Sequence, residues 1–476
     1  MGAGIAQLAC LGRFETWMHD PLPDALAAGE KRVGDGLDKG AARGTWSESE
    51  AAAARGRLHL ARDLEELRGC ELVIEAAPEE LELKRDLFAK LASICGHETI
   101  FATNTSSLSV TAIAAGTDRP ERVCGMHFFN PPPLMRLVEI VAGDDTAPET
   151  LEAATEVGRA MQREPIRAAD GIGFVANRCA RPFTLEALRL AGERVAPIDQ
   201  IDRIVRIGGG FRMGPFELMD LVGVDVNFEV AKSFWEQSFH EPRWQPHPIQ
   251  ARTVAAGRHG RKTGRGYYDY SQGPHRPDDV DPPEETEAPA HADPIRFDGD
   301  GFTAINIADA AELAPPGPLN TLQFTEERHP IEPGRIVYFV AFPTLSEATA
   351  VELARAPTTE NSALAAAGAA FAAMGKHVEC VLECRPGLVL GRILAQIVNE
   401  AHFAVDQGVA SAEDCDTAMR LGFNWPRGPF EWGSAIGLGR CAAILDALHR
   451  SLGEERYRVS PLLRRRAEAK PPLESS

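Results

Sequence analysis

Apolar and polar positions alternate with two different periods along the first 140 residues. Apolar residues at helical spacing follow Gly2 for about ten positions, and a short strand-like run over 15–19 stops at Asp20. Further runs of strand length cover 71–76, 99–103, 122–126 and 137–141. A helical pattern of charged and apolar positions follows the first of these runs, from Lys84 to Ile94. Strands that alternate with helices predict a parallel, doubly wound α/β sheet.

The pattern becomes mainly helical from about residue 145, and 173–194 predict one long helix. The segment 271–300 holds many acidic residues and five prolines within "PDDVDPPEETEAPAHADP", with few apolar residues that could pack. This composition predicts a linker. The following region, 301–384, mixes strands such as 336–340 with alanine-rich helix, and we expect a small mixed region there.

Part of the helical region occurs twice. The stretch "GFVANRCARPF" is echoed 214 residues later by "GLVLGRILAQI", and "GPFE" recurs at the same offset. An ungapped match of this kind predicts a helical domain over 144–270 with a degenerate second copy over 385–476. Asn177 in the first copy corresponds to Gly391 in the second. We therefore expect that only the first copy serves a site.

Composition and charge narrow the class of protein. The chain has 476 residues, of which 44% are hydrophobic and 25% charged, as in ordinary globular proteins. No apolar run reaches the roughly 18 residues of a membrane span, and no basic, signal-like N-terminus is visible. The net charge of −19 argues against nonspecific nucleic-acid binding and means that a polyanionic ligand needs a locally basic site. Nine cysteines without a C-x2-C pair predict free thiols in a reducing cytoplasm, with no metal site.

The first twenty residues match the second half of a dinucleotide-binding unit. Gly2 would be the third glycine of Gly-x-Gly-x-x-Gly, and Gly4 would keep the helix slim. Asp20 lies 18 residues after Gly2, where an acid binds the adenosine ribose hydroxyls. A carboxylate there repels a 2′-phosphate, so the pattern favours NAD over NADP. An amphipathic helix followed by an Asp-Pro turn explains the same residues without a cofactor.

The stretch "GMHFFNPPPLMRLVEIV" carries the candidate chemistry. His127 ends a strand, and Glu139 lies on the next strand after a proline-rich turn. Doubly wound sheets place their ligands at the carboxyl ends of strands. A neutral imidazole can take a hydroxyl proton while a hydride leaves the same carbon, and a buried carboxylate can fix the tautomer of the ring. The alternatives are a core histidine and a structural ion pair.

Four motifs, "NTSSLSVTAIA", "GMHFFNPPPLMRLVEIV", "GFVANRCARPF" and "GRKTGRGYYDY", resemble the L-3-hydroxyacyl-CoA dehydrogenase family. The resemblance covers nearly the whole chain and is greatest to long bacterial members with a duplicated C-terminal domain, which include 3-hydroxyadipyl-CoA and 3-hydroxybutyryl-CoA dehydrogenases of phenylacetate catabolism. It implies an NAD-binding, Rossmann-like domain over 1–143 and duplicated all-α domains of the 6-phosphogluconate-dehydrogenase type. The site is then expected in the cleft between the Rossmann-like domain and the first helical copy.

The resemblance also implies roles for individual residues. The catalytic set would be His127 as general acid/base, Glu139 as its partner, Ser106 at the 3-oxygen of the substrate, and Asn177 on the substrate side. The residues implied for NAD binding are Gly2, Asp20, Glu79, Lys84, Ser106, Asn130 and Lys262. Ser106 could instead cap a helix, and Lys84 and Lys262 could simply be solvated lysines.

The chain departs from the family at its start, because the family begins with a strand and "GxGTMGAG" whereas this sequence begins at that methionine. Two explanations are open: a start assigned at an internal methionine, or a truncation that leaves a sheet without its first strand. The second would favour a catalytically silent acyl-CoA or protein-binding relative. Among enzymes, a short-chain 3-hydroxybutyryl-CoA dehydrogenase is the alternative. Relatives with one helical copy dimerise through it, so we expect the second copy to pack on the first.

Overall fold

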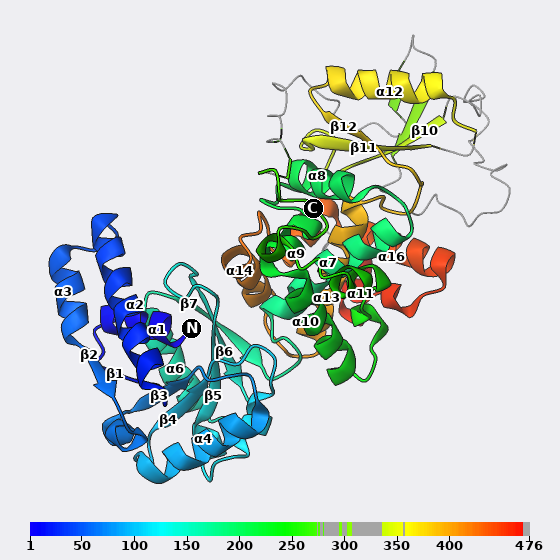
Figure 1. Cartoon of the computed structure of the whole chain (residues 1–476). Helices are drawn as coiled ribbons and strands as arrows, with labels where there is room; N and C mark the ends of the chain where they lie inside the picture. Colours follow the sequence, from blue (N-terminus) through cyan, green and yellow to red (C-terminus); the bar gives the residue numbers. More distant parts are fainter. Residues whose placement is uncertain are drawn as a thin grey trace, which may run out of the picture. The chain divides into compact units, whose positions relative to one another are not determined.

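The computed structural model describes residues 1–273, 275–276, 279, 295–297, 302–306, 336–355 and 358–469. These form two compact units, which Figure 1 shows in the colours of the sequence. The first unit comprises Met1–Arg178 and Gly408–Phe423, and the second comprises Cys179–Gln407 and Asn424–Ser476. Most of the predicted linker, 271–300, lies outside the described residues.

The first unit begins with the predicted helix and strand. Its first five elements are α1 (Gly2–Leu11), β1 (Thr16–His19), α2 (Pro23–Ala42), α3 (Glu48–Gly56) and β2 (Leu58–Ala61). β1 pairs with β2 in parallel, and α1, α2 and α3 share a small apolar core around Cys10, Val33 and Ala54. Ser47 caps α3 and shares a capping box with Glu50, which explains where that helix begins.

A five-stranded sheet forms the rest of this unit, in the order β3-β4-β5-β6-β7. The strands are β3 (Leu72–Glu75), β4 (Ile100–Thr103), β5 (Val123–Phe128), β6 (Leu137–Ala142) and β7 (Glu164–Ala169). The connecting helices are α4 (Leu81–Ile94), α5 (Val110–Ala114) and α6 (Pro148–Ala160). α1 packs against this sheet through Ile5 and Leu8, in a core that includes Met126 and Ile140. Within the described residues, β1 and β2 form a sheet of their own.

The prediction of an all-parallel sheet is wrong at one position. β3, β4 and β5 are parallel, but β6 runs antiparallel to β5, with His127 opposite Glu139. The connection between β5 and β6 spans only residues 129–136. A parallel crossover needs about a dozen residues or more, so this short turn forces the reversal.

The helices of the two copies follow each other at the predicted offset. The first copy consists of α7 (Ala176–Gly192), α8 (Ile198–Gly209), α9 (Pro215–Val222), α10 (Val224–Gln237) and α11 (Pro248–Ala255). The second consists of α13 (Leu390–Asp406), α14 (Ala412–Gly422), α15 (Pro429–Ile436), α16 (Leu438–Leu452) and α17 (Pro461–Glu468). The helix predicted over 173–194 begins later, at Ala176, because Gly173 and Phe174 have positive φ angles of 70° and 48°.

Buried ion pairs join the two copies within the second unit. Arg392 of α13 is fully buried and pairs with Glu186 and Glu193 of the first copy. Arg243 of the first copy donates to Glu400 of the second at 2.5 Å, and both side chains are buried. The second copy therefore packs on the first, as the duplication predicts.

The region between the copies repeats part of the first unit, a relation that was not foreseen from the sequence. Its strands are β8 (Ile295–Phe297), β9 (Phe302–Asn306), β10 (Ile336–Ala341), β11 (Ala350–Arg355) and β12 (His377–Cys380), with α12 (Asn361–Ala373) packed beside them in Figure 1. β10 and β11 are antiparallel, α12 connects β11 to β12, and β11 and β12 are parallel. This is the order and direction of β5, β6, α6 and β7.

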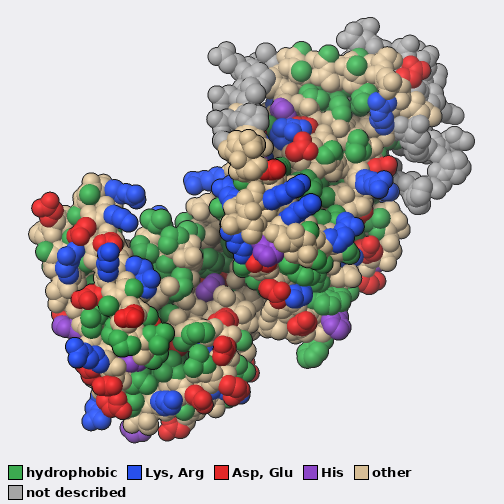
Figure 2. Space-filling model, in the orientation of Figure 1, with side chains coloured by type: hydrophobic (Ala, Val, Ile, Leu, Met, Phe, Trp, Pro, Cys, Tyr) green, Lys and Arg blue, Asp and Glu red, His purple; other side chains and the backbone are tan. Residues whose placement is uncertain are grey.

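The surface of the described residues carries charges of both signs. In Figure 2, Lys and Arg side chains are interspersed with Asp and Glu over both units on the face shown. The nine cysteines are free thiols. Among the described helices, none combines the length and apolarity required to span a bilayer.

Candidate active site

His127 and Glu139 form a buried pair across the antiparallel strands β5 and β6. His127 Nδ1 lies 2.6 Å from Glu139 Oε2, and the residues are 6% and 0% exposed. Because the carboxylate accepts a hydrogen bond, Nδ1 carries the proton and Nε2 of the neutral ring presents its lone pair. The pair is therefore arranged for His127 Nε2 to accept a proton.

The second oxygen of Glu139 fixes the start of α7. Oε1 accepts the backbone N–H groups of Val175 at 3.0 Å and Ala176 at 2.9 Å. These belong to the first turn of the helix, where N–H groups have no helical acceptor. One buried carboxylate therefore orients the histidine ring and anchors the segment that carries Asn177, which is the second residue of α7 and is half-buried.

Aromatic rings surround His127. The ring of Phe129 lies 4.7 Å from the imidazole between centroids, and that of Phe174 lies 5.9 Å away. Phe423, directly after α14, contacts Phe129 edge-on at 6.3 Å. The second helical copy thus contributes a side chain near this pair, which the repeat pattern had assigned to the first copy alone.

The loop after β4 is organised by Glu79. Its Oε1 accepts hydrogen bonds from Thr105 Oγ1 at 2.6 Å, from the Ser106 N–H at 2.9 Å and from the Ser107 N–H at 3.1 Å. Burial would raise the pKa of Glu79, but these hydrogen bonds and the charge of Lys84 outweigh burial and lower it. The loop is therefore fixed around an ionised carboxylate.

Ser106 is exposed in this loop, near the end of β5. Asn104 Oδ1 accepts the N–H of Phe128 at 2.8 Å, which ties the loop to the strand that carries His127. The alternative that Ser106 caps a helix is wrong, because Ser109 caps α5 by accepting the Ala112 N–H. The Ser106 hydroxyl, 3.5 Å from Glu79, is free of that structural task.

Lys84 is buried rather than solvated. It is 1% exposed, and its Nζ donates to Glu75 Oε1 at 2.7 Å and lies 3.4 Å from Glu79 Oε2. Glu75, at the end of β3, also accepts the Thr103 hydroxyl at 2.8 Å. Glu75 was not among the residues predicted from the sequence, although the acid that ends the run "ELVIEA" was a visible signal. The network joins β3, α4 and β4.

The residues expected at the cofactor lie at one end of α1 and β1 and in the loop after β5. A Cβ at Gly2 would meet no atom within 4 Å, so the N-terminus of α1 is open to a phosphate group. A Cβ at Gly4 would lie 3.1 Å from Pro132, which confirms that this helix must be slim there. Asp20 directly follows β1 and accepts the Leu22 N–H at 3.0 Å through one oxygen, and Asn130 is exposed after Phe129. These residues fit a dinucleotide.

Lys262 belongs to the second unit. It lies in the turn η4 (Arg261–Thr263) and donates to Asp225 at 2.7 Å, with about half of its side chain exposed. The solvated reading thus holds in part, since the lysine is both ion-paired and accessible.

Comparison with known proteins decides what this arrangement belongs to. Residues 1–171 match the sequence family described as 3-hydroxyacyl-CoA dehydrogenase, NAD binding domain, and residues 173–270 and 387–473 match the C-terminal domain of the same dehydrogenase. The chain belongs to the 3-hydroxyacyl-CoA dehydrogenase family. It is accordingly an NAD-dependent oxidoreductase with a Rossmann-like N-terminal domain and mostly helical C-terminal domains.

Individual relatives cover the dehydrogenase along its whole length. It is 38% identical over 467 residues to the 3-hydroxyadipyl-CoA dehydrogenase of Escherichia coli K12, covering 98% of this chain and 95% of that one. A crystal structure of a protein named 3-hydroxybutyryl-CoA dehydrogenase, also from E. coli K12, superposes with a TM-score of 0.86 at 37% identity over 98% and 96% of the chains. A probable 3-hydroxybutyryl-CoA dehydrogenase of Bacillus subtilis is 38% identical over 57% of this chain and 94% of its own.

The second half of the dehydrogenase contains a counterpart of Glu139. Glu352 on β11 is opposite Val340 on β10 in the register in which Glu139 is opposite His127. Its two oxygens accept the N–H groups of Val389 at 2.8 Å and Leu390 at 3.0 Å, at the start of α13. The second half thus keeps the helix-anchoring acid and has valine at the position of the histidine.

Proposed function

We propose that this dehydrogenase oxidises the 3-hydroxyl group of an (S)-3-hydroxyacyl-CoA with His127 as the general base. The observation that carries the proposal is the buried 2.6 Å contact between His127 Nδ1 and Glu139, which leaves Nε2 able to accept a proton. Glu139 stabilises the imidazolium that forms when the proton arrives.

The chemistry balances with one base and one hydride acceptor. His127 Nε2 takes the proton from the substrate hydroxyl, the C3–H bond breaks, and the C3–O bond becomes a carbonyl. NAD, when bound, accepts the hydride from C3. In the reverse direction the His127 imidazolium returns the proton. Phe129 and Phe174 shield the imidazole from water during the transfer.

Further residues would hold the reactants. We assign Ser106 to the 3-oxygen of the substrate and Asn177 to its thioester side, since Ser106 is exposed near the end of β5 and Asn177 follows the anchor of Glu139. The residues that would hold NAD are Gly2, Asp20, Glu79, Lys84, Ser106, Asn130 and Lys262.

Replacement of the histidine tests the proposed base. In His127→Gln we expect the turnover number to fall by about 10²–10⁴, because proton transfer loses its acceptor. Circular dichroism and NAD binding should stay unchanged. A turnover number within threefold of the wild type would overturn the mechanism.

We propose 3-hydroxyadipyl-CoA as the substrate, because the E. coli relative with that name matches the chain over nearly its full length. The test compares kcat/KM for (S)-3-hydroxyadipyl-CoA and (S)-3-hydroxybutyryl-CoA. We expect at least a tenfold preference for the dicarboxylic substrate. A preference for the butyryl substrate would favour the short-chain activity for which the similar E. coli crystal structure is named.

We also propose that the two helical copies act as a pair within one chain and that the enzyme works in the cytoplasm. The buried pairs of Arg392 with Glu186 and of Arg243 with Glu400 support the first proposal. Nine free thiols support the second, because such a set persists in a reducing compartment.

A further inference from the structure

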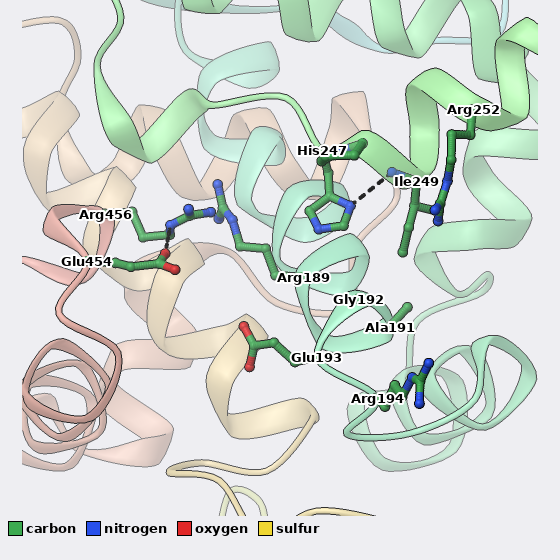
Figure 3. Close-up of a pocket in the computed structure, with 11 residues that line it drawn as sticks. Arg189, Ala191, Gly192, Glu193, Arg194, His247, Ile249, Arg252, Glu454 and Arg456 are labelled. Atoms are coloured by element: carbon green, nitrogen blue, oxygen red, sulfur yellow. Dashed lines mark hydrogen bonds and ion pairs between the residues drawn. The ribbon is translucent and has the colours of Figure 1, made fainter.

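A cavity in the second unit lies between the two helical copies. Its volume is about 540 Å³, a size typical of small-molecule sites. Figure 3 shows the residues that line it, which come from the end of α7, the start of α11 and the turn around η7 (Glu455–Tyr457). The charged and titratable residues among them are Arg189, Glu193, Arg194, His247, Arg252, Glu454 and Arg456. Four arginines face two glutamates, one of which, Glu454, pairs with Arg456, so the lining is positive in a chain of net charge −19.

Arg189 is the buried cation of this cavity. It is 5% exposed, and its Nη1 donates to Glu186 at 2.9 Å, but its Nε has no hydrogen-bond partner among the described residues. Glu186 is shared with the fully buried Arg392, so its single charge cannot neutralise both arginines. Unpaired donors in a buried guanidinium are costly unless a ligand satisfies them.

Arg456 and His247 face the same space. Figure 3 shows the guanidinium groups of Arg189 and Arg456 and the ring of His247 directed toward the middle of the cavity. Burial and the charge of Arg189 lower the pKa of Arg456. Burial and the charges of Arg189, Arg456 and Arg252 lower the pKa of His247 to about 4, so its ring is neutral. His247 Nδ1 accepts the Ile249 N–H at 3.2 Å, which leaves Nε2–H as a donor.

The pseudo-equivalent position in the other copy lacks this concentration of cations. Phe403 of α13 corresponds to Arg189 of α7, and Arg243 of η3 (Pro242–Trp244) corresponds to Arg456 of η7. There the Arg243 guanidinium lies over the Phe403 ring, 3.9 Å from its centroid. A cation over an aromatic face is a satisfied arrangement, whereas two facing arginines repel each other. The duplication has therefore replaced a stable contact by two like charges on one side only.

We propose that this cavity is a binding site for a phosphate monoester of a small molecule, held between Arg189, Arg456 and His247. Guanidinium and imidazole N–H groups are donors without acceptors, and a phosphate dianion offers acceptor oxygens and two charges to match both arginines. The volume exceeds that of the phosphate group alone, which leaves room for the remainder of a small metabolite beside exposed Arg194 and Arg252. The proposal uses residues of the second unit alone and does not depend on the reaction assigned above.

Inorganic phosphate is the probe for the test. Isothermal titration calorimetry is run on the full chain with saturating NAD, at pH 7.5 and constant ionic strength adjusted with sodium chloride. We expect saturable binding by the wild type. Arg189→Phe, which installs the residue of the other copy, and Arg456→Gln should each weaken binding about tenfold or more, the effect of losing one charged hydrogen bond.

Arg465→Gln is the matched control, because Arg465 is an exposed arginine of α17 that pairs with Asp406 outside the cavity. It should bind phosphate like the wild type. If Arg189→Phe does not fold, Arg456→Gln decides the question. Wild-type binding that is not saturable by 20 mM phosphate, or equal binding by the wild type and the folded cavity variants, would overturn the proposal.

Discussion

Glu139 and Glu352 show how one residue can serve two tasks that a second copy separates. Both are fully or almost fully buried, and both accept two backbone N–H groups at the start of a long helix. Only Glu139 also meets an imidazole, because Val340 stands where His127 would be. The anchoring of a helix is therefore the task common to both acids, and the orientation of the histidine is added to it in the first half.

Glu139→Gln should separate these tasks in the first half. The amide oxygen can still accept the Val175 and Ala176 N–H groups, but the amide NH₂ then faces His127 Nδ1 and forces the proton onto Nε2. We expect the turnover number to fall by about 10²–10⁴, with the fold retained, because the ring no longer offers a base. Steady-state kinetics and near-ultraviolet circular dichroism check both expectations.

Glu352→Gln is the matched control for that variant, since it removes the same charge from the same kind of helix anchor. It should leave the turnover number within twofold of the wild type. Equal losses of activity in the two variants would mean that Glu139 acts through the fold and not through His127.

The stability of the second half should depend on pH through Glu352. Burial raises the pKa of its carboxyl from 4.5 to about 8, although the N–H groups of Val389 and Leu390 oppose the rise. The folded chain thus holds a proton that the unfolded chain releases near pH 4.5. The resulting stabilisation is complete below that pH and is lost as the pH rises through 8. Glu352→Gln should remove this part of the pH dependence, and thermal unfolding between pH 6 and 9 checks it. Parallel curves for variant and wild type would contradict the assignment.

At the scale of elements, the ion pair of Lys84 and Glu75 holds β3 to α4. Lys84→Met leaves the Glu75 carboxylate buried without its cation, which typically costs about 3–5 kcal/mol. We expect a lower urea midpoint in Lys84→Met. Lys262→Met, which breaks a half-exposed pair with Asp225, should change stability by about 1 kcal/mol or less. Similar midpoints for the two variants would show that the buried pair is not a structural link.

The elements of the first unit were easier to predict from the sequence than their pairing. Periodicity and motif placed α1, β1, α4 and the pair His127–Glu139 correctly, because these signals are local. The direction of β6 was wrong because it depends on the length of a turn that alternation does not report. The burial of Lys84 was missed because a lysine is usually exposed, and only the meeting of β3 with α4 buries it. The relation of β10–β12 to β5–β7 lies in register and direction, which no short motif carries.

At the scale of the whole molecule, the buried pairs between the helical copies predict that the chain stays together when cut. A specific protease site inserted at 285–290, within the predicted linker, should yield two fragments that elute together in gel filtration. The reason is that Arg392 is fully buried among acids of the first copy.

A variant with both Arg392→Met and Arg243→Met should release the fragments or lower their joint melting temperature. Arg464→Met, which breaks a pair with Asp446 inside the second copy, is the control and should leave the fragments associated. Fragments of the wild type that elute separately after cleavage would show that the copies behave independently.

The pairing of two related domains in one chain also has a genetic consequence. In a homodimer each substitution appears at both symmetry-related positions, so a change that helps one side is imposed on the other. Here α7 and α13 are separately encoded, and Arg189 could arise opposite Arg456 while Phe403 was kept beneath Arg243. An asymmetric feature of this kind is open to selection only in a fused gene, and its inheritance does not disturb the corresponding contact on the other side.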